Sequence, residues 1–266
     1  MKKRNWVVFL LVIFLPFFCY FFLKITSQRA LVMPRHYIYD SLVENDINGR
    51  IEIDTVWHTL SNLKMVNQFN DSVSLWQLKG KIIVLDYFFT RCAGICPKLT
   101  KNMQQLQQSF KIGGQHRFKL DTSVVQFISL SVDPDYDQST ILREYAKRFE
   151  IVNDNWWLCT GNKKALYDFA FEDLKVDRFT DEAISPEFVH TNRFVLIDKN
   201  FNIRGYYNGL DKESIKKLAG DIGLLVLEKG TKKSNSLIEK YAEIKWVLLL
   251  AVIWIVLFIF ILRKFK

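Results

Sequence analysis

Short apolar runs and helically spaced apolar residues follow one another through the middle of the chain. Residues 81–89 (KIIVLDYFF) and 124–132 (VVQFISLSV) are runs rich in β-branched and aromatic residues, and residues 156–160 (WWLCT) form a shorter one. Runs of this kind are typical of buried strands. Residues 97–110 carry apolar side chains at spacings of four, three and four, which is one face of a helix. The pattern therefore predicts buried strands joined by helices.

The later part of the middle region continues this pattern and then changes it. Residues 133–149 begin as a turn and become helical, and residues 161–174 and 210–229 carry two further helical patterns. Residues 192–198 and 202–208 are predicted strands, close enough along the chain to form a hairpin. Parallel crossovers followed by an antiparallel edge predict an α/β fold, a thioredoxin-like mixed sheet flanked by helices.

Two long apolar runs lie near the ends of the chain. Trp6–Leu23 is an uncharged run of 18 residues, and Trp246–Leu262 is another of 17. Each approaches the roughly 20 residues that cross a bilayer as a helix, so we predict an N-terminal and a C-terminal transmembrane helix. A cleaved signal peptide is the alternative for the first run, but its apolar part is long and no A-x-A site follows. Lipid attachment at Cys19 would need small residues before that cysteine, and a buried core helix is the alternative for the second run.

Charge at the two ends predicts the orientation in the membrane. Of the formal net charge of +9, residues 1–4 supply +3 and residues 245–266 supply +4, which leaves +2 between them. By the positive-inside rule, both termini are cytoplasmic and the segment between them faces the periplasm from the inner membrane. Because the middle of the chain is nearly neutral, we expect no nucleic-acid partner. The two apolar runs make the lipid bilayer an expected partner.

These patterns divide the chain into five predicted parts. Residues 1–23 form the N-terminal anchor, and residues 24–50, which are mixed and weakly periodic, form a tether. Residues 51–229 form the thioredoxin-like domain and residues 230–244 a linker. Residues 245–266 form the second span with a short cytoplasmic tail.

Candidate chemistry lies where the first buried run gives way to the first helix. Cys92 and Cys96 stand there with three residues between them, and Pro97 follows, a residue suited to the first turn of a helix. The helix dipole stabilises anions at this position, so we expect lowered thiol pKa values. We also expect Gly94 to let the backbone fold tightly between the cysteines. The pair can exchange electrons, bind a soft metal ion or form a plain disulfide, although closing so short a loop gains little entropy.

His190 is the third candidate ligand. It precedes the predicted strand at 192–198, which we expect to lie near the strand that leads into the cysteines. Two thiolates and one imidazole suit Cu(I), or Cu(II) with an added ligand, whereas a structural zinc site would need a fourth protein ligand. Asp133 either supports the site from behind or caps the following helix. We expect no metal-binding role for the remaining candidates, which are the histidines His36, His58 and His116 and the apolar-flanked Cys159.

Four segments taken together resemble the Sco/SenC family, the copper chaperones of cytochrome c oxidase assembly. They are FFTRCAGICPKLTKNMQQLQ, ISLSVDPDYDQSTILREYAKRF, WWLCTGNKKALYDFA and VHTNRFVLID, and the resemblance covers roughly residues 51–228. It implies a thioredoxin-like domain held outside the cytoplasm, with copper bound by Cys92, Cys96 and His190. It also implies that the chain delivers copper to the binuclear copper centre of the oxidase, or reduces the cysteines of that centre. The expected partner is the copper-bearing oxidase subunit or another copper chaperone.

Two features depart from the family pattern, and a second function stays open. The family generally has one N-terminal anchor, so the second span is unusual, and Cys159 stands where an apolar residue is common. The alternative is an extracytoplasmic thiol–disulfide oxidoreductase with Cys92 and Cys96 as its catalytic pair and His190 as a bystander or proton-transfer group. Peroxide reduction through one low-pKa cysteine is a minor third option.

Overall fold

A computed structural model describes residues 32–47, 50–111, 124–152, 154–176 and 191–228. Among them, no helix combines the length and the apolar character that a bilayer crossing requires. Both predicted transmembrane helices lie outside the described residues, so they stay predictions. His190, His116 and Cys19 also lie outside the described residues.

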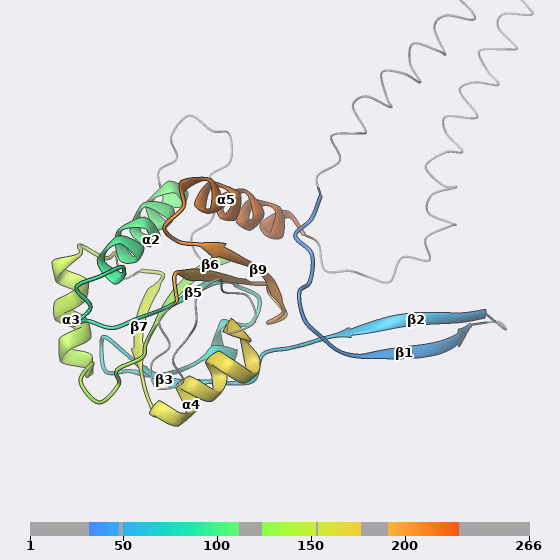
Figure 1. The fold of residues 1–266 in the computed structure, drawn as a ribbon, viewed down its shortest axis with the longest axis horizontal. Coiled ribbons are helices and arrows are strands. Elements are labelled where there is room, and N and C mark those ends of the chain that lie inside the picture. The colour runs from blue at the N-terminus through green and yellow to red at the C-terminus, as the bar shows by residue number, and fades with distance from the viewer. Residues whose placement is uncertain (1–31, 48–49, 112–123, 153, 177–190, 229–266) are drawn as a thin grey trace, which may run out of the picture. The chain divides into compact units, whose positions relative to one another are not determined.

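Seven strands form one mixed sheet in the order β4-β3-β7-β6-β5-β8-β9 (Figure 1). The three central strands β7, β6 and β5 are parallel, and β8 joins β5 in the antiparallel direction. The α/β fold with a mixed sheet is therefore confirmed. The strands are β3 (Lys64–Asn67), β4 (Ser72–Ser74), β5 (Ile82–Phe88), β6 (Val125–Ser131), β7 (Trp156–Thr160), β8 (Arg193–Ile197) and β9 (Ile203–Asn208).

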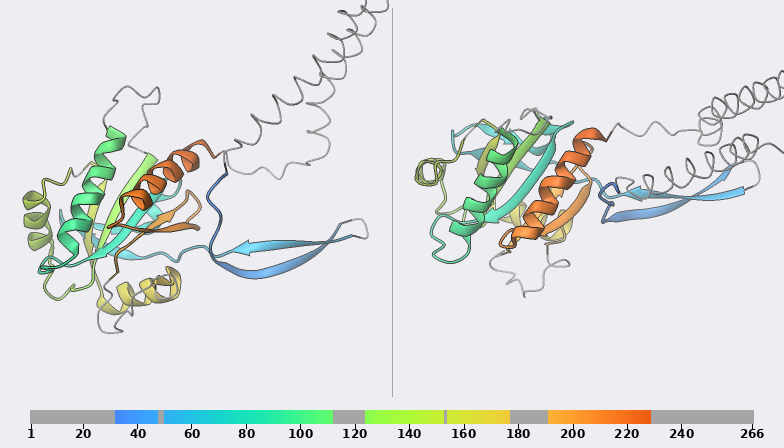
Figure 2. Two further views of the ribbon diagram at one scale, coloured as in Figure 1. Left: turned by 45° about the horizontal axis from the view of Figure 1, so that its top comes forward. Right: turned by 90° about the horizontal axis from the view of Figure 1, so that it is seen from above.

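Helices cover both faces of this sheet (Figure 2). α2 (Cys96–Lys111), α3 (Ser139–Arg148) and α5 (Lys212–Leu227) pack on one face. α4 (Lys163–Asp168), continued by a π-helical turn at Phe169–Asp173, packs on the other face. A 3₁₀ turn at Leu75–Leu78 follows β4. Because the central strands are covered twice, all seven residues of β5 and of β6 are buried, as their continuous apolar runs predict.

β1 (Tyr39–Ile47) and β2 (Arg50–Trp57) form a separate two-stranded antiparallel sheet. The apolar pattern predicts no helix or strand here, and residues 39–50 fall within the predicted tether. Asn48 and Gly49 stand between the two strands, and an Asn-Gly pair between strands is a strong hairpin signal. Acidic residues interrupt the apolar pattern of both strands, which is why the hairpin escaped the search for buried runs.

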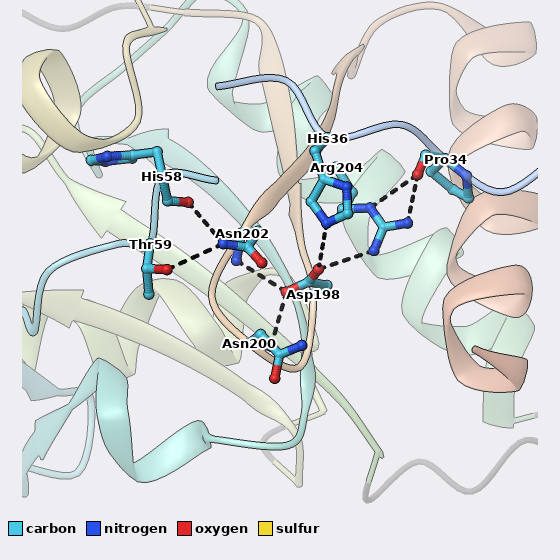
Figure 3. Close-up of polar contacts among 8 residues, drawn as sticks. All are labelled: Pro34, His36, His58, Thr59, Asp198, Asn200, Asn202 and Arg204. Atoms are coloured by element: carbon cyan, nitrogen blue, oxygen red, sulfur yellow. Dashed lines mark hydrogen bonds and ion pairs between the residues drawn. The ribbon is translucent and has the colours of Figure 1, made fainter. Parts of the chain in front are cut away.

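The segment before β1 is fastened to the β8–β9 hairpin by an arginine that also belongs to a buried ion pair (Figure 3). The Arg204 guanidinium lies 3.0 Å from the Asp198 carboxylate, and both side chains are at most 5% exposed. The same guanidinium donates to the carbonyl of Pro34 from Nε at 3.0 Å and from Nη2 at 2.6 Å. The His36 ring lies 3.7 Å from Asp198 and stacks on Trp57. His36 thus has a structural role in the described residues.

Candidate metal centre

The cysteine pair lies on the loop between β5 and α2. Cys92 is half-buried, and its N–H donates to the carbonyl of Phe89 at 3.2 Å. Cys96 is buried and opens α2, with Pro97 as the second residue of the helix, so the helix start predicted here is confirmed. Neither thiol is part of a disulfide, and the two lie close enough for Cys92 to influence the pKa of Cys96. One sulfur therefore faces the surface while the other lies beneath it.

Burial, and not the helix start, dominates the acidity of Cys96. Loss of water raises the pKa of this thiol well above its ordinary value, and the hydrogen bond with Cys92 adds to the rise. The backbone N–H of Phe89 opposes the rise by less. The expectation of a lowered pKa is wrong for Cys96, because desolvation penalises the charged thiolate more than the nearby dipoles stabilise it. Cys96 is therefore a neutral thiol at neutral pH.

Gly94 is less important to the loop than the sequence suggested. Its φ angle is outside the left-handed region, and the nearest atom to a Cβ built there is the Cys92 sulfur at 3.8 Å, an ordinary contact. The loop between the cysteines therefore has no need of a glycine at this position.

Asp137 holds the cysteine loop against the turn that precedes α3. This carboxylate is fully buried and accepts from the Thr90 N–H at 3.1 Å. It also accepts short hydrogen bonds from the hydroxyls of Thr90 and Ser131. Three donors, two from Thr90 in the cysteine loop and one from Ser131 at the end of β6, thus converge on the Asp137 carboxylate. Sequence reasoning considered Asp133 and passed over Asp137, although both belong to the same DPDYD motif.

Asp133 lies beside the site but acts through Arg91. Its carboxylate pairs with the Arg91 guanidinium, which also lies 4.1 Å from the centre of the Tyr136 ring. Its carbonyl accepts from the N–H groups of Tyr136 and Asp137, so it also closes the turn before α3. The turn foreseen at Asp133 is thus present, but the N-cap of α3 is Gln138, and support of a metal site by Asp133 stays a prediction. Next to Cys92 is an open groove of about 520 Å³ lined by Thr90, Arg91, Ala93, Tyr136, Ile141, Glu144, Tyr145 and Arg148.

Asp86 is a buried acid in β5 on the face that α2 covers. Its neighbours in the strand, Val84 and Phe88, share a core cluster with Cys96. The side chain of Asp86 is 2% exposed and leaves Oδ1 without a partner in the described structure. Burial raises the pKa of Asp86 to about 7. The sequence signal for this residue is a single acid inside the apolar run KIIVLDYFF, which the sequence analysis does not consider.

The remaining sequence candidates separate clearly. Cys159 is fully buried in β7, and burial raises the pKa of its thiol, as expected of a structural cysteine. His58 hydrogen-bonds Asp40 at 2.7 Å, far along the chain from the cysteines. His190 lies outside the described residues, but the strand that follows it is described. β8 pairs antiparallel with β5, with Val195 opposite Leu85, so the chain enters β8 at the edge where β5 leads into the cysteine loop.

The donor chemistry of the pair fits a soft metal ion. Two neighbouring thiols can turn both sulfurs toward one ion once their protons leave, and thiolates prefer Cu(I) among the common metals. Among the residues that the structure describes, no set of three histidine, cysteine or carboxylate side chains converges to hold a metal ion. His190, the third ligand predicted from the sequence, lies outside them and stays a prediction. The same two sulfurs could equally form a disulfide.

Comparison with known proteins gives a consistent picture. The SCO1/SenC family model matches residues 57–225. The SCO1 protein homolog of Bacillus subtilis (strain 168) is 29% identical over 157 residues, which are 59% of this chain and 77% of that protein. A SCO1/SenC family lipoprotein from Bacillus anthracis has a crystal structure that is 30% identical with a TM-score of 0.54, covering 64% of this chain and 95% of that one.

The structure of BsSco is also similar, at 27% identity and a TM-score of 0.53 over 66% of this chain and 98% of that one. BsSco is described as a member of the Sco family of cytochrome c oxidase assembly proteins and contains a disulfide switch. Copper is bound in two more distant structures, ScoI of Bradyrhizobium japonicum and ScoI of Arabidopsis thaliana, each 18% identical to this chain with a TM-score of 0.47.

Proposed function

Because this chain belongs to the SCO1/SenC family, whose proteins share a thioredoxin-like fold, we propose that it is a membrane-anchored copper chaperone. In this proposal it binds copper through Cys92, Cys96 and His190. It delivers the ion to the binuclear copper centre of cytochrome c oxidase, or prepares the thiols of that centre. The observation that carries the proposal is the pair of free, neighbouring thiols between β5 and α2.

The unequal burial of the two sulfurs suggests an order of events. Copper arrives at Cys92, which is half-buried beside an open groove, and Cys96 loses its proton as it becomes the second ligand. Because burial keeps Cys96 neutral, this step is coupled to proton release. Transfer to a partner reverses this order. A partner thiol approaches the ion from the more exposed side, where Cys92 lies. A proton that returns to Cys96 favours release of the ion from that sulfur first.

His190 is proposed as the third ligand on the evidence of topology. The backbone carbonyl of Asn192, two residues further on, accepts from the Gly209 N–H at 2.7 Å. The Gly209 carbonyl accepts from the side-chain amide of Asn102 in α2, also at 2.7 Å. The chain just after His190 is therefore linked to the helix that Cys96 opens. One imidazole beside two thiolates retains copper while leaving the site open to exchange.

Location and partners belong to the same proposal. The two apolar runs would anchor the chain in the inner membrane, with both termini in the cytoplasm and the domain in the periplasm. A family relative from Bacillus anthracis is a lipoprotein, which supports membrane attachment of some kind. The copper-bearing oxidase subunit or another copper chaperone would then meet Cys92 on the periplasmic side.

Copper retention by the full chain tests the proposal. The chain in detergent is reduced, loaded with copper and washed with a competing chelator, and the metal is then measured. We expect about one copper per chain, retained by Cys159→Ala and lost at least tenfold from Cys92→Ser and from Cys96→Ser. Equal retention in all four proteins would contradict copper binding at this pair.

Thiol–disulfide exchange is the second candidate function, favoured by the contact between two free thiols and by the disulfide switch in BsSco. The two functions differ in what they ask of His190, because exchange needs only the sulfurs. His190→Ala should therefore exchange disulfides at the rate of the parent chain under either function. If this variant also retains copper equally well, the imidazole is a bystander, and the oxidoreductase hypothesis is favoured.

A further inference from the structure

The β1–β2 hairpin lies outside the part of the chain that the family model matches. That match begins at residue 57, where β2 ends. In the described residues the two strands pair only with each other, so each has one edge without a neighbouring strand. A lone two-stranded ribbon is marginally stable in water and gains stability when a third strand or another surface covers it. The hairpin is therefore an addition to the family fold that calls for a covering partner.

Strand register defines the composition of one face of this hairpin. Leu42, Glu44 and Asp46 of β1 stand opposite Thr55, Ile53 and Ile51 of β2, respectively, and cross-strand partners share a face. We call these six residues the acid–isoleucine face. Its apolar members are unusually exposed, at 58% for Leu42, 65% for Ile53 and 70% for Ile51. The carboxylates of the face lie along β1 and the isoleucines along β2.

The negative charge of the hairpin indicates which kind of partner it would bind. Residues 39–57 contain five carboxylates and one arginine, a formal charge of −4 in a chain whose formal charge is +9. A second copy of the hairpin would bring like charges together, which is unfavourable. Anionic lipid headgroups would be repelled by the same carboxylates, and with one arginine and no lysine the hairpin lacks the basic cluster of membrane-binding segments. A basic polypeptide is attracted instead.

We propose that the free edge of β1 accepts a strand from a partner protein, with lysine or arginine beside Glu44 and Asp46 and an apolar residue beside Leu42. Alternate residues of an added strand fall on one face, so cations two positions apart meet both carboxylates. The backbone of the partner satisfies the unpaired N–H and C=O groups of the β1 edge. The partner extends the acid–isoleucine face to a third strand and shields Leu42, the apolar member of the face that lies on β1.

Hydrogen bonds connect the open end of the β1–β2 hairpin to the rest of the domain. His58 Nδ1 lies 2.7 Å from the Asp40 carboxylate of β1, and the His58 N–H donates to the carbonyl of Ile38 at 3.0 Å. The His58 carbonyl in turn accepts from Asn202 at 2.9 Å in the β8–β9 turn (Figure 3). A partner bound at β1 is thus linked through a few hydrogen bonds to the domain that carries the cysteines.

Two synthetic strand peptides test this docking. One is a nine-residue strand that carries two lysines and a valine at successive alternate positions, and the other has glutamates in place of the two lysines; both have capped ends and a fluorescent label. The full chain in zwitterionic nanodiscs is titrated against each peptide by fluorescence anisotropy, with empty nanodiscs as the blank. We expect the lysine peptide to bind at least about tenfold more tightly than the glutamate peptide, and the difference to shrink with added salt.

Matched variants locate the contact. Glu44→Lys and Leu42→Ser change β1 side chains beside the added strand, and each should weaken binding of the lysine peptide by about tenfold. Asp54→Lys makes the same charge change on the opposite face, where Asp54 faces Val43, and should change binding less than about twofold. Copper retention should be unchanged in all three variants, so this test fails or succeeds separately from the proposed function.

Four results would overturn the proposal. They are equal binding of the two peptides, equal losses in Glu44→Lys and Asp54→Lys, and self-association of the chain that Ile53→Ser abolishes in the absence of peptide. The fourth is preferential binding of the hairpin to anionic nanodiscs, abolished by Ile53→Ser. The last two would assign the face to a second copy or to lipid.

Discussion

Burial gives Cys92 and Cys96 different parts in the proposed chemistry. Cys92 is half-buried beside a groove, while Cys96 is buried and its pKa is raised by loss of water and by the hydrogen bond with Cys92. Sequence spacing identified the pair but could not distinguish its members, because exposure depends on how the loop lies against the sheet. A buried neutral thiol must lose its proton before it can bind a metal ion.

Proton release on copper binding is the first prediction at this scale. Because Cys96 is neutral at neutral pH, each copper bound should release at least about one proton, and copper affinity should rise about tenfold per pH unit for each proton released. A pH indicator in weakly buffered solution measures the protons, with Cys159→Ala as the control chain. Copper bound tightly without proton release would show that Cys96 is not a ligand.

Asp86 predicts how stability depends on pH. The pKa of Asp86 is raised to about 7 in the folded chain, so the folded state holds this proton more tightly than the unfolded state does. The contribution of Asp86 to stability is therefore fully present below its ordinary pKa and is lost as pH rises through about 7. Between about pH 5 and pH 8 this loss is on the order of 3 kcal/mol.

The Asp86→Asn variant should remove that slope. Asparagine cannot ionise, so the variant should keep its stability from about pH 5 to 8 and be the more stable chain at the upper end. Thermal unfolding of both chains across this range provides the measurement. Parallel pH profiles for the two proteins would mean that Asp86 is already ionised in the fold.

At the scale of elements, apolar patterning predicted the centre of the sheet well and its periphery poorly. β5, β6 and β7 lie within one residue of their predicted bounds, because strands covered on both faces read as continuous apolar runs. β3 and β4 have only three or four residues and escaped the analysis. The β1–β2 hairpin escaped because its apolar residues face solvent, so no core requirement shaped the pattern.

The candidate site divides in the same way between what sequence can and cannot predict. Motif spacing indicated Cys92 and Cys96 at a helix start, and the structure has them there. It could not indicate Asp137, because the contact between this residue and Thr90 joins two loops 47 positions apart in sequence. Long-range hydrogen bonds of this kind leave no local pattern.

Asp137 should therefore be important for the stability of the cysteine loop. Asp137→Asn puts an amide donor where three hydrogen-bond donors already converge, which should lower the free energy of unfolding by about 3 kcal/mol. Asp135→Asn is the matched control, because the Asp135 side chain is 80% exposed and its loss should cost about 0.5 kcal/mol or less. Chemical denaturation measures both, and equal effects would deny Asp137 its role as a clamp.

At the scale of the whole molecule, a buried ion pair connects the N-terminal segment to the sheet. Arg204 pairs with Asp198 and donates to the Pro34 carbonyl, so one guanidinium joins the chain before the hairpin to the β8–β9 turn. Removing one partner of a buried pair leaves the other charge uncompensated. The domain and the segment that leads toward the predicted N-terminal anchor are therefore coupled energetically.

Arg204→Met tests this coupling. The change should lower the free energy of unfolding by about 3 to 5 kcal/mol and expose the segment around Pro34 to limited proteolysis. Arg35→Met is the control, because Arg35 is exposed and its main contact is the face of Tyr37 at 4.8 Å. Similar stability and cleavage in the two variants would show that the ion pair does not fasten the segment.

X-ray absorption at the copper edge tests the central claim most directly. On the copper-loaded full chain, we predict a ligand shell of two sulfurs and at least one imidazole nitrogen. His190→Ala should lose the nitrogen and keep both sulfurs, while His116→Ala should leave the spectrum unchanged. A shell that contains no sulfur, or one that His190→Ala leaves intact, would contradict the assignment of copper to Cys92, Cys96 and His190.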